Sequence, residues 1–170
     1  MALFLITSGI LAIVVVCTLA SVAKADVISE EDFVHKASVA NKFEIESSKL
    51  ALDKSQNGQI KKFAQHMVDD HTKTAKTLEE TLTSADVNVT PANHLDDKHQ
   101  KLLAELQSLS GVAFDKRYID LQTTAHKKAV KLFSDYSKNG KNQALKNFAS
   151  DTLPALKKHL KYVQKLQAHE

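Results

Sequence analysis

The chain has 170 residues, 43% of them hydrophobic and 25% charged, which is enough for one globular domain with a core of its own. Only four Gly and two Pro interrupt a sequence rich in Ala, Leu, Lys and Gln, so the composition favours helix over sheet. The net charge is +3 and lysines alternate with acidic residues, which excludes a continuous phosphate-binding surface, and we expect no nucleic acid partner.

Residues 1–25 predict an export signal. A long apolar run ends in the tripeptide Ala-Lys-Ala at 23–25, whose small outer residues match a signal-peptidase site. Cleavage after Ala25 leaves a domain of residues 26–170 and removes Cys17, the only cysteine, so the mature chain has no disulfide and no membrane span. No Lys or Arg precedes the run, which is long enough to cross a bilayer. An uncleaved N-terminal anchor that faces the periplasm is therefore the alternative.

Apolar residues recur at steps of three and four along most of the mature chain, which predicts helices. Ser29 is a suitable N-cap and is followed by three acidic residues, so we expect a first helix over residues 29–57. Asn-Gly at 57–58 stops this helix, and a second is expected over 59–84. Residues 86–94 lack periodicity and are expected to form the longest loop.

Beyond this loop the pattern predicts a short helix over 95–109 and long helices over 112–138 and 142–167. Pro154 lies inside the last of them and is expected to kink or break it, because proline removes a backbone hydrogen bond and clashes one turn back. Four helices of similar length joined by mostly short links predict an all-α, antiparallel four-helix bundle. The short helix is an extra element before the third long one.

Two large apolar residues of the first helix, Phe43 and Leu50, lie outside its apolar stripe. If they are exposed, they mark a surface for a homodimer, although single exposed apolar residues are also common on monomers.

Each long helix carries one polar residue near the centre of its apolar stripe. At about 100° per residue, His71 and His159 fall almost at the centres of their stripes, and Glu44 lies about 30° from its own. His126 lies at the edge of the stripe of the third long helix. Further polar residues on the same helices come close to these positions: Asn41, Asp70, Asp115 and Gln122.

Buried carboxylates and imidazoles need partners, and three interpretations fit these residues. They form a hydrogen-bond network that fixes the register of the helices, or several of them face solvent. The third interpretation is a site for one divalent transition metal ion, zinc, copper or iron, in the bundle core. Its ligands would be Glu44, His71, His126 and His159, surrounded by Asn41, Asp70, Asp115 and Gln122. The sequence has no nucleophile elbow, phosphate loop or HExxH motif, so we expect binding rather than catalysis.

Three segments carry a resemblance to a known family: ASVANKFEIESSKLALDKSQNGQIKKFAQHMVDDH, SGVAFDKRYIDLQTTAH and FASDTLPALKKHL. Together they resemble a bacterial family of exported proteins with a domain of unknown function, placed among ferritin-like bundles. The resemblance extends from about Glu31 to Leu166. The positions that match the hallmarks of the family are Glu44, Asp70, His71, Phe114, Asp115, Tyr118, His126, Pro154 and His159.

The resemblance implies a ferritin-like fold and a periplasmic or envelope location in a Gram-negative bacterium, and it implies no activity. The sequence departs from di-iron ferritin-like proteins, because it has no paired Glu-x-x-His motifs. We therefore expect neither ferroxidase activity nor iron storage, and at most a mononuclear site. Two roles remain open for such a bundle: binding of one metal ion, or a metal-free module that protects the envelope under stress.

Overall fold

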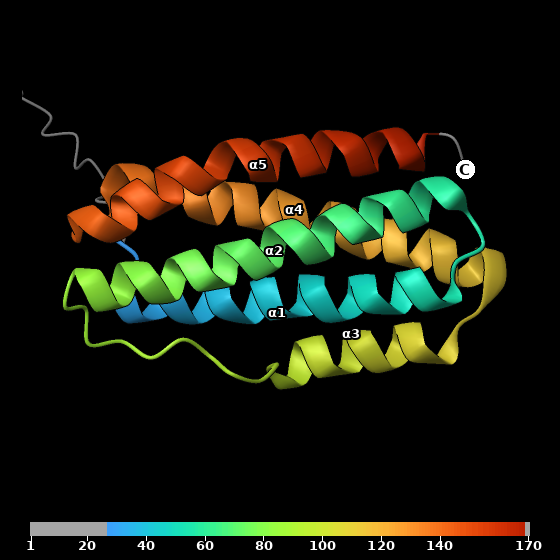
Figure 1. Ribbon diagram of the computed structural model, residues 1–170, viewed down its shortest axis with the longest axis horizontal. Coiled ribbons are helices and arrows are strands. Elements are labelled where there is room, and N and C mark those ends of the chain that lie inside the picture. Colours follow the sequence, from blue (N-terminus) through green and yellow to red (C-terminus); the bar gives the residue numbers. More distant parts are fainter. Residues whose placement is uncertain (1–26, 169–170) are drawn as a thin grey trace, which may run out of the picture.

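The computed structural model describes residues 27–168, and the regular structure in this range is entirely helical. Five helices follow in chain order: α1 (Glu30–Lys54), α2 (Gly58–Ser84), α3 (Asp97–Ser108), α4 (Gly111–Asn139) and α5 (Gln143–Gln167). The four long helices form the bundle, and α3 lies outside it along α1 (Figure 1). The predicted all-α bundle, with one short extra helix before the third long one, is confirmed.

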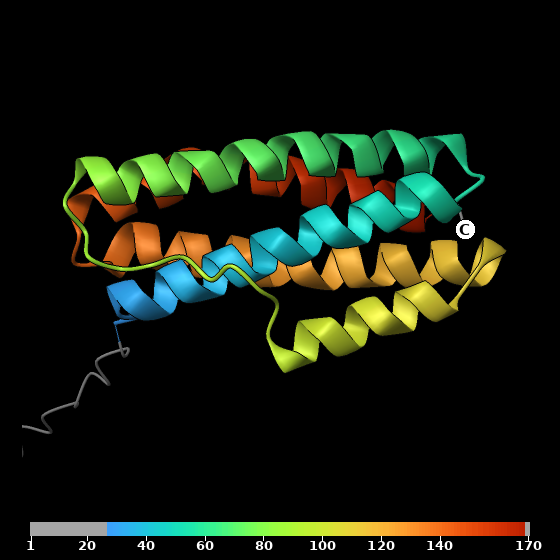
Figure 2. The same ribbon diagram turned by 60° about the horizontal axis from the view of Figure 1, so that its bottom comes forward.

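Neighbouring long helices run in opposite directions. α1 packs on α2 and α4, and α5 packs on the same two helices. All four of these pairs are antiparallel, whereas α2 and α4 run the same way (Figures 1 and 2). The chain must therefore return along the bundle between α2 and α4, and a loop followed by α3 makes this crossover. A bundle with one long crossover connection is the arrangement of ferritin-like folds.

Polar side chains begin most of the helices. The side chains of Ser29, Asn57, Asp96 and Asn142 each accept a hydrogen bond from a backbone N–H in the first turn of the helix that follows. α4 differs, because its N-cap makes no such bond and the helix starts at Gly111, whose φ of +56° is a left-handed conformation that glycine adopts easily.

The apolar core consists of two clusters, one toward each end of the bundle. Phe63 and Phe114 belong to the first cluster, and Phe33 and Phe148 to the second. On every long helix, the segment that packs in one cluster is separated from the segment that packs in the other by a short stretch. The polar residues predicted from the sequence lie in or beside these stretches, and the packing therefore places them at one level: Glu44, His71, His126 and His159.

Phe43 and Leu50, which lie outside the predicted stripe, do not form an exposed surface. Phe43 is only 2% exposed, and its ring centroid lies 5.2 Å from that of His99 in α3. Leu50 is half-buried against the same cluster. The reason is that α3 covers a second face of α1, so this helix has two buried faces. The two residues consequently give no support for a homodimer surface at this place.

Some predicted boundaries also shift. α1 ends at Lys54 rather than near residue 57, and α3 begins at Asp97 rather than at 95. Pro154 was expected to kink or break the last helix, and α5 continues through this residue without a break. Pro154 and Ser150, whose carbonyl loses its helical partner, are both exposed, so water can hydrate the free oxygen.

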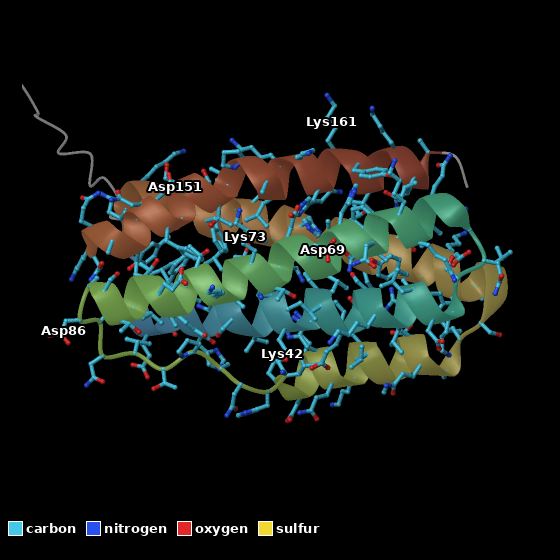
Figure 3. The ribbon with its side chains drawn as sticks, viewed as in Figure 1. Lys42, Asp69, Lys73, Asp86, Asp151 and Lys161 are labelled. Atoms are coloured by element: carbon cyan, nitrogen blue, oxygen red, sulfur yellow. The ribbon has the colours of Figure 1, made fainter. Side chains whose placement is uncertain are left out.

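The outer surface of the bundle is charged. Lys73, Asp151 and Lys161 are exposed, and Lys161 points away from the bundle (Figure 3). None of the helices in residues 27–168 is long and apolar enough to cross a membrane. The predicted signal peptide at residues 1–25 lies outside the described residues.

Candidate metal centre

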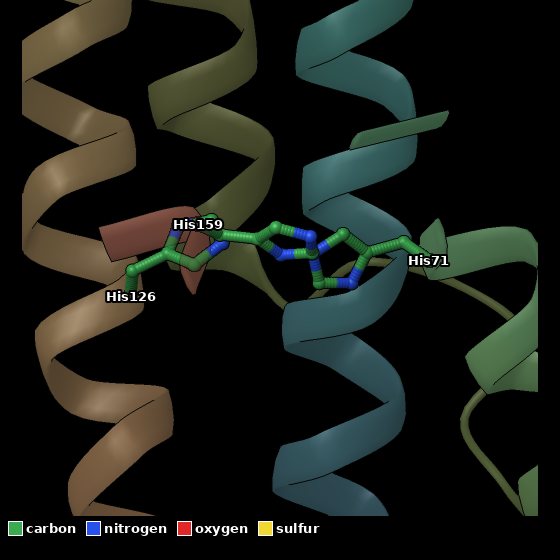
Figure 4. Close-up of side chains that lie close together, drawn as sticks. All are labelled: His71, His126 and His159. Carbon is green, nitrogen blue, oxygen red and sulfur yellow. The ribbon is translucent and has the colours of Figure 1, made fainter. Parts of the chain in front are cut away.

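Three histidines from three different helices meet in the middle of the bundle. His71 of α2 and His159 of α5 are 5% exposed, and His126 of α4 is 1% exposed. Their ring centroids form a nearly equilateral triangle, with sides of 5.7, 5.6 and 5.4 Å. One ring nitrogen from each residue lies within 4.8 Å of the others. Figure 4 shows the three rings close together, with the side chains of His71 and His126 entering from opposite sides.

The outer nitrogens of His71 and His126 are fixed by hydrogen-bond acceptors. The side-chain N–H of Asn41 donates to the backbone carbonyl of His71 over 2.8 Å. This bond turns the side-chain oxygen of Asn41 toward Nδ1 of His71, which lies 2.8 Å from it. Nδ1 of His126 lies 2.9 Å from the backbone oxygen of Gln122, which can only accept. Both Nδ1 atoms therefore carry the proton, and both Nε2 atoms keep a free lone pair.

His159 uses its nitrogens the other way round. Its Nε2 donates to the carboxylate of Asp70 over 2.8 Å, so the lone pair stays on Nδ1. The three atoms with free lone pairs are all buried and have no hydrogen-bond partner among the described residues: Nε2 of His71, Nε2 of His126 and Nδ1 of His159. Three acceptors cannot satisfy one another, so each of them needs a proton donor or a cation. Imidazoles whose second nitrogen donates to a carboxylate or a carbonyl oxygen are typical of metal ligands.

Glu44 lies beside this group rather than at its centre. Its Oε1 is 3.9 Å from Nδ1 of His126, the nitrogen that faces Gln122, and its Oε2 is buried without a partner. Burial raises the pKa of Glu44 to about 8, although a hydrogen bond from the Gln122 side chain lowers it in part. The carboxyl group is therefore mostly neutral at pH 7. The structure brings the three histidines together and places Glu44 next to the outer nitrogen of one of them.

Burial disfavours the charged form of all three imidazoles. Burial lowers the pKa of His126 to about 4, although the hydrogen bond to the backbone of Gln122 raises this pKa in part. The pKa of His71 is lowered by burial and by the two neighbouring histidines. The pKa of His159 is lowered by burial more than the Asp70 carboxylate raises it. At neutral pH the site thus offers three uncharged nitrogen donors, which is the form that metals bind.

These shifts predict a stability maximum near pH 6.5 for the metal-free protein. The histidines have lower pKa values when folded, so their contribution is present above the unfolded value of 6.5 and is lost as pH falls below it, in the case of His126 toward about 4. Glu44 has a raised pKa, so its contribution is present below 4.5 and is lost as pH rises through about 8. Between pH 4.5 and 6.5 the three histidines change the stability more than Glu44 does, so stability rises with pH. Above pH 6.5 only Glu44 still changes the stability, which then falls as pH rises.

Denaturant unfolding in the presence of a chelator measures this profile at pH 5, 6.5 and 8. We expect lower stability at pH 5 and pH 8 than at pH 6.5, and no decline above pH 6.5 in a Glu44→Gln variant. A stability that stays constant from pH 5 to pH 7 would contradict the burial of neutral imidazoles.

Asp115, also predicted near the site, is not connected to the histidines. Its carboxylate is half-buried, and no hydrogen bond or ion pair joins it to them within residues 27–168.

Two buried serines of α1, Ser47 and Ser48, were not singled out by the sequence, although they add polar contacts beside the histidines. Gln122 donates to Ser47 over 3.1 Å, and Ser48 lies 2.8 Å from the hydroxyl of Tyr118. Ser48 follows Glu44 by four residues, which is about one helical turn, and this spacing was the available signal.

Chemically, the centre is a set of neutral donors without a reactive partner. Within the described residues no serine, cysteine or lysine nucleophile contacts the three histidines, and Glu44 faces the outer side of one ring. The arrangement can hold a cation or a proton donor, and it supplies no separate acid, base and nucleophile.

Comparisons with known proteins agree with this fold. Residues 17–166 match the family described as Domain of unknown function (DUF4142), and the chain belongs to this family. No curated protein sequence matches the chain.

Several solved structures have the same bundle. CopM in the Cu(II)-bound form is similar with a TM-score of 0.69 at 17% identity, over 83% of this chain and 97% of that one. CopM in the Cu(I)-bound form gives a TM-score of 0.67 at the same identity, over 83% and 96% of the two chains. A DUF305 fragment from Deinococcus radiodurans gives a TM-score of 0.70 at 12% identity, over 81% and 94% of the two chains.

Proposed function

We propose that this member of the DUF4142 family is an exported binding protein that holds one divalent transition metal ion between His71, His126 and His159. One observation carries the proposal: one ring nitrogen of each histidine lies within 4.8 Å of the others. Each histidine also keeps one buried nitrogen without a hydrogen-bond partner among the described residues, while its other nitrogen is fixed by an acceptor. Such a set leaves nothing for the inner nitrogens to bind except a cation or a proton donor. Glu44 is proposed as a neighbour of the ligand His126 rather than as a ligand.

Copper(II) or zinc suits the donor set best. Imidazole nitrogen favours both ions, whereas iron(II) sites usually add carboxylate ligands. No cysteine lies in residues 27–168, so the described chain offers no thiolate for a softer site. The resemblance to copper-bound CopM supports copper as the first ion to test, although at 17% identity it is a likeness of fold.

The location of the protein is part of the same proposal. The leader at residues 1–25 is proposed to be cleaved after Ala25, which leaves the bundle domain 26–170 in the periplasm, where a soluble binding protein meets imported or toxic metal ions. After expression of the full chain, the intact mass of the protein from the envelope fraction is expected to start at Asp26. A species in the membrane fraction that keeps the leader would support the anchored alternative.

The alternative function is a metal-free protective module. The observation in its favour is that Asn41 connects His71 to α1 and Asp70 connects His159 to α2, while the side chain of Gln122 in α4 donates to Ser47 of α1. These bonds fix the helices relative to one another. The two candidates differ in whether a metal ion binds between the inner nitrogens.

Calorimetric titration of the protein purified from the envelope fraction, freed of metal with a chelator, tests the proposal. We expect one copper(II) or zinc ion per chain, and a loss of affinity of more than about 100-fold in a His71→Ala/His159→Ala double variant, since even outer partners of ligands contribute 10- to 100-fold. A His35→Ala/His66→Ala double variant removes two exposed helical histidines and serves as the matched control. Equal binding by all three folded proteins would return the buried histidines to a structural role.

A further inference from the structure

A cavity of about 520 Å3 lies beside the three histidines. Its walls come from α1, α2, α4 and α5 and from residues 90–93 of the crossover loop, and His71 and His126 form part of its lining. The volume is within the range of about 300–1,000 Å3 that is typical of small-molecule pockets.

The cavity has a polar end and an apolar body. The polar end is formed by His71, His126 and Glu44, whose Nε2, Nε2 and Oε2 atoms are buried without hydrogen-bond partners among the described residues. From there the cavity extends into the second apolar cluster, whose members in the lining are Ala37, Leu78, Phe133, Phe148 and Leu156.

A molecule can reach the cavity from the surface near the crossover loop. The lining includes Glu79, Thr90 and Asn93, which are exposed. The backbone N–H of Ala92 donates to the hydroxyl of Ser38 over 2.8 Å and holds the loop against α1 at this place. The interior is thus connected to solvent between α1, α2 and the loop.

Two of the three proposed ligands of the metal ion, His71 and His126, also line the cavity. Three imidazoles leave one position open on a four-coordinate ion, as in zinc sites that bind an external ligand. An ion held by the three histidines would therefore lie next to the cavity, and we infer that its open position is filled from that side.

We propose, on the premise of the proposed metal site, that the cavity binds a monocarboxylate with a hydrocarbon chain. Its carboxylate occupies the open position of the ion, and its chain lies against Leu78, Phe133, Phe148 and Leu156. A carboxylate oxygen is an accepted ligand of zinc and copper, and it offsets part of the positive charge that three neutral imidazoles leave on the ion. A hydrocarbon chain matches the apolar walls, which gain from burying it.

Binding of straight-chain carboxylates from butanoate to octanoate to the zinc-loaded protein tests the inference by calorimetry. The affinity is expected to rise about fourfold with each added methylene group, or roughly 250-fold from butanoate to octanoate. An affinity independent of chain length would show an anion on the metal without a chain in the cavity, and would overturn the inference.

A variant that fills the cavity sharpens the test. Ala129→Leu adds a side chain to the wall on α4, and it is expected to remove most of the gain with chain length while one zinc ion still binds. Ala113→Leu on the exposed side of the same helix is the matched control and should behave as the wild type. If Ala129→Leu does not fold, as judged by its thermal unfolding, Ala75→Leu on α2 fills the same cavity.

Zinc is titrated into every sample before the carboxylates. Zinc binding without octanoate binding in the wild-type protein overturns this inference alone. Absence of zinc binding overturns the proposed function and the inference that rests on it.

Discussion

Saturating copper(II) or zinc is expected to stabilise the folded protein by about 4 kcal/mol when the free ion is present at 1,000 times its dissociation constant. The ion binds the folded chain only, because the ligands His71, His126 and His159 come from three helices and are far apart in the sequence. Thermal unfolding with and without a chelator measures the effect as a rise in Tm that grows with metal concentration.

The histidine variants make this expectation specific. A His159→Ala variant should show almost no rise in Tm on addition of the ion, whereas a variant of the exposed His66 should show the full rise. The same rise in both proteins would mean that the ion binds elsewhere on the chain.

The second large effect is expected at Phe33, which lies far from the metal centre. Replacing it by alanine should lower the free energy of unfolding by about 3–5 kcal/mol, as is typical for a fully buried aromatic residue. Phe33 is 0% exposed and stacks on Tyr136 with ring centroids 3.9 Å apart, and the rings of Phe133 and Phe148 meet it edge-on at 5.3 and 6.4 Å.

Denaturant unfolding of Phe33→Ala measures this loss, with Val112→Ala as the control. Val112 is 84% exposed and should change the stability by less than about 0.5 kcal/mol. A loss below about 1 kcal/mol at Phe33 would argue against the aromatic packing at this end of the bundle.

Helical periodicity was enough to predict the fold and part of the site. A repeat of 3.6 residues reports which side chains share a face, so it placed His71 and His159 toward the core. The same signal is insensitive to a second covered face. For this reason the periodicity placed Phe43 outside the buried stripe of α1, although α3 covers Phe43 in the structure.

Periodicity does not reveal how far each helix is shifted along its neighbours. The level of His71, His126 and His159 depends on the packing of the two apolar clusters on either side of them, which is a tertiary property. Packing also decides whether a polar residue faces the centre of the three histidines or their outer side. Glu44 is inward-facing in the sequence pattern, and only the packing shows it beside the outer nitrogen of His126.

Anomalous diffraction from crystals grown with one equivalent of copper(II) or zinc tests the central claim most directly. We expect a single strong peak about 2 Å from Nε2 of His71, Nε2 of His126 and Nδ1 of His159, the usual length of a bond between such ions and imidazole. A peak at a surface group such as His99 and Asp96, with none between the three buried histidines, would contradict the proposed metal centre.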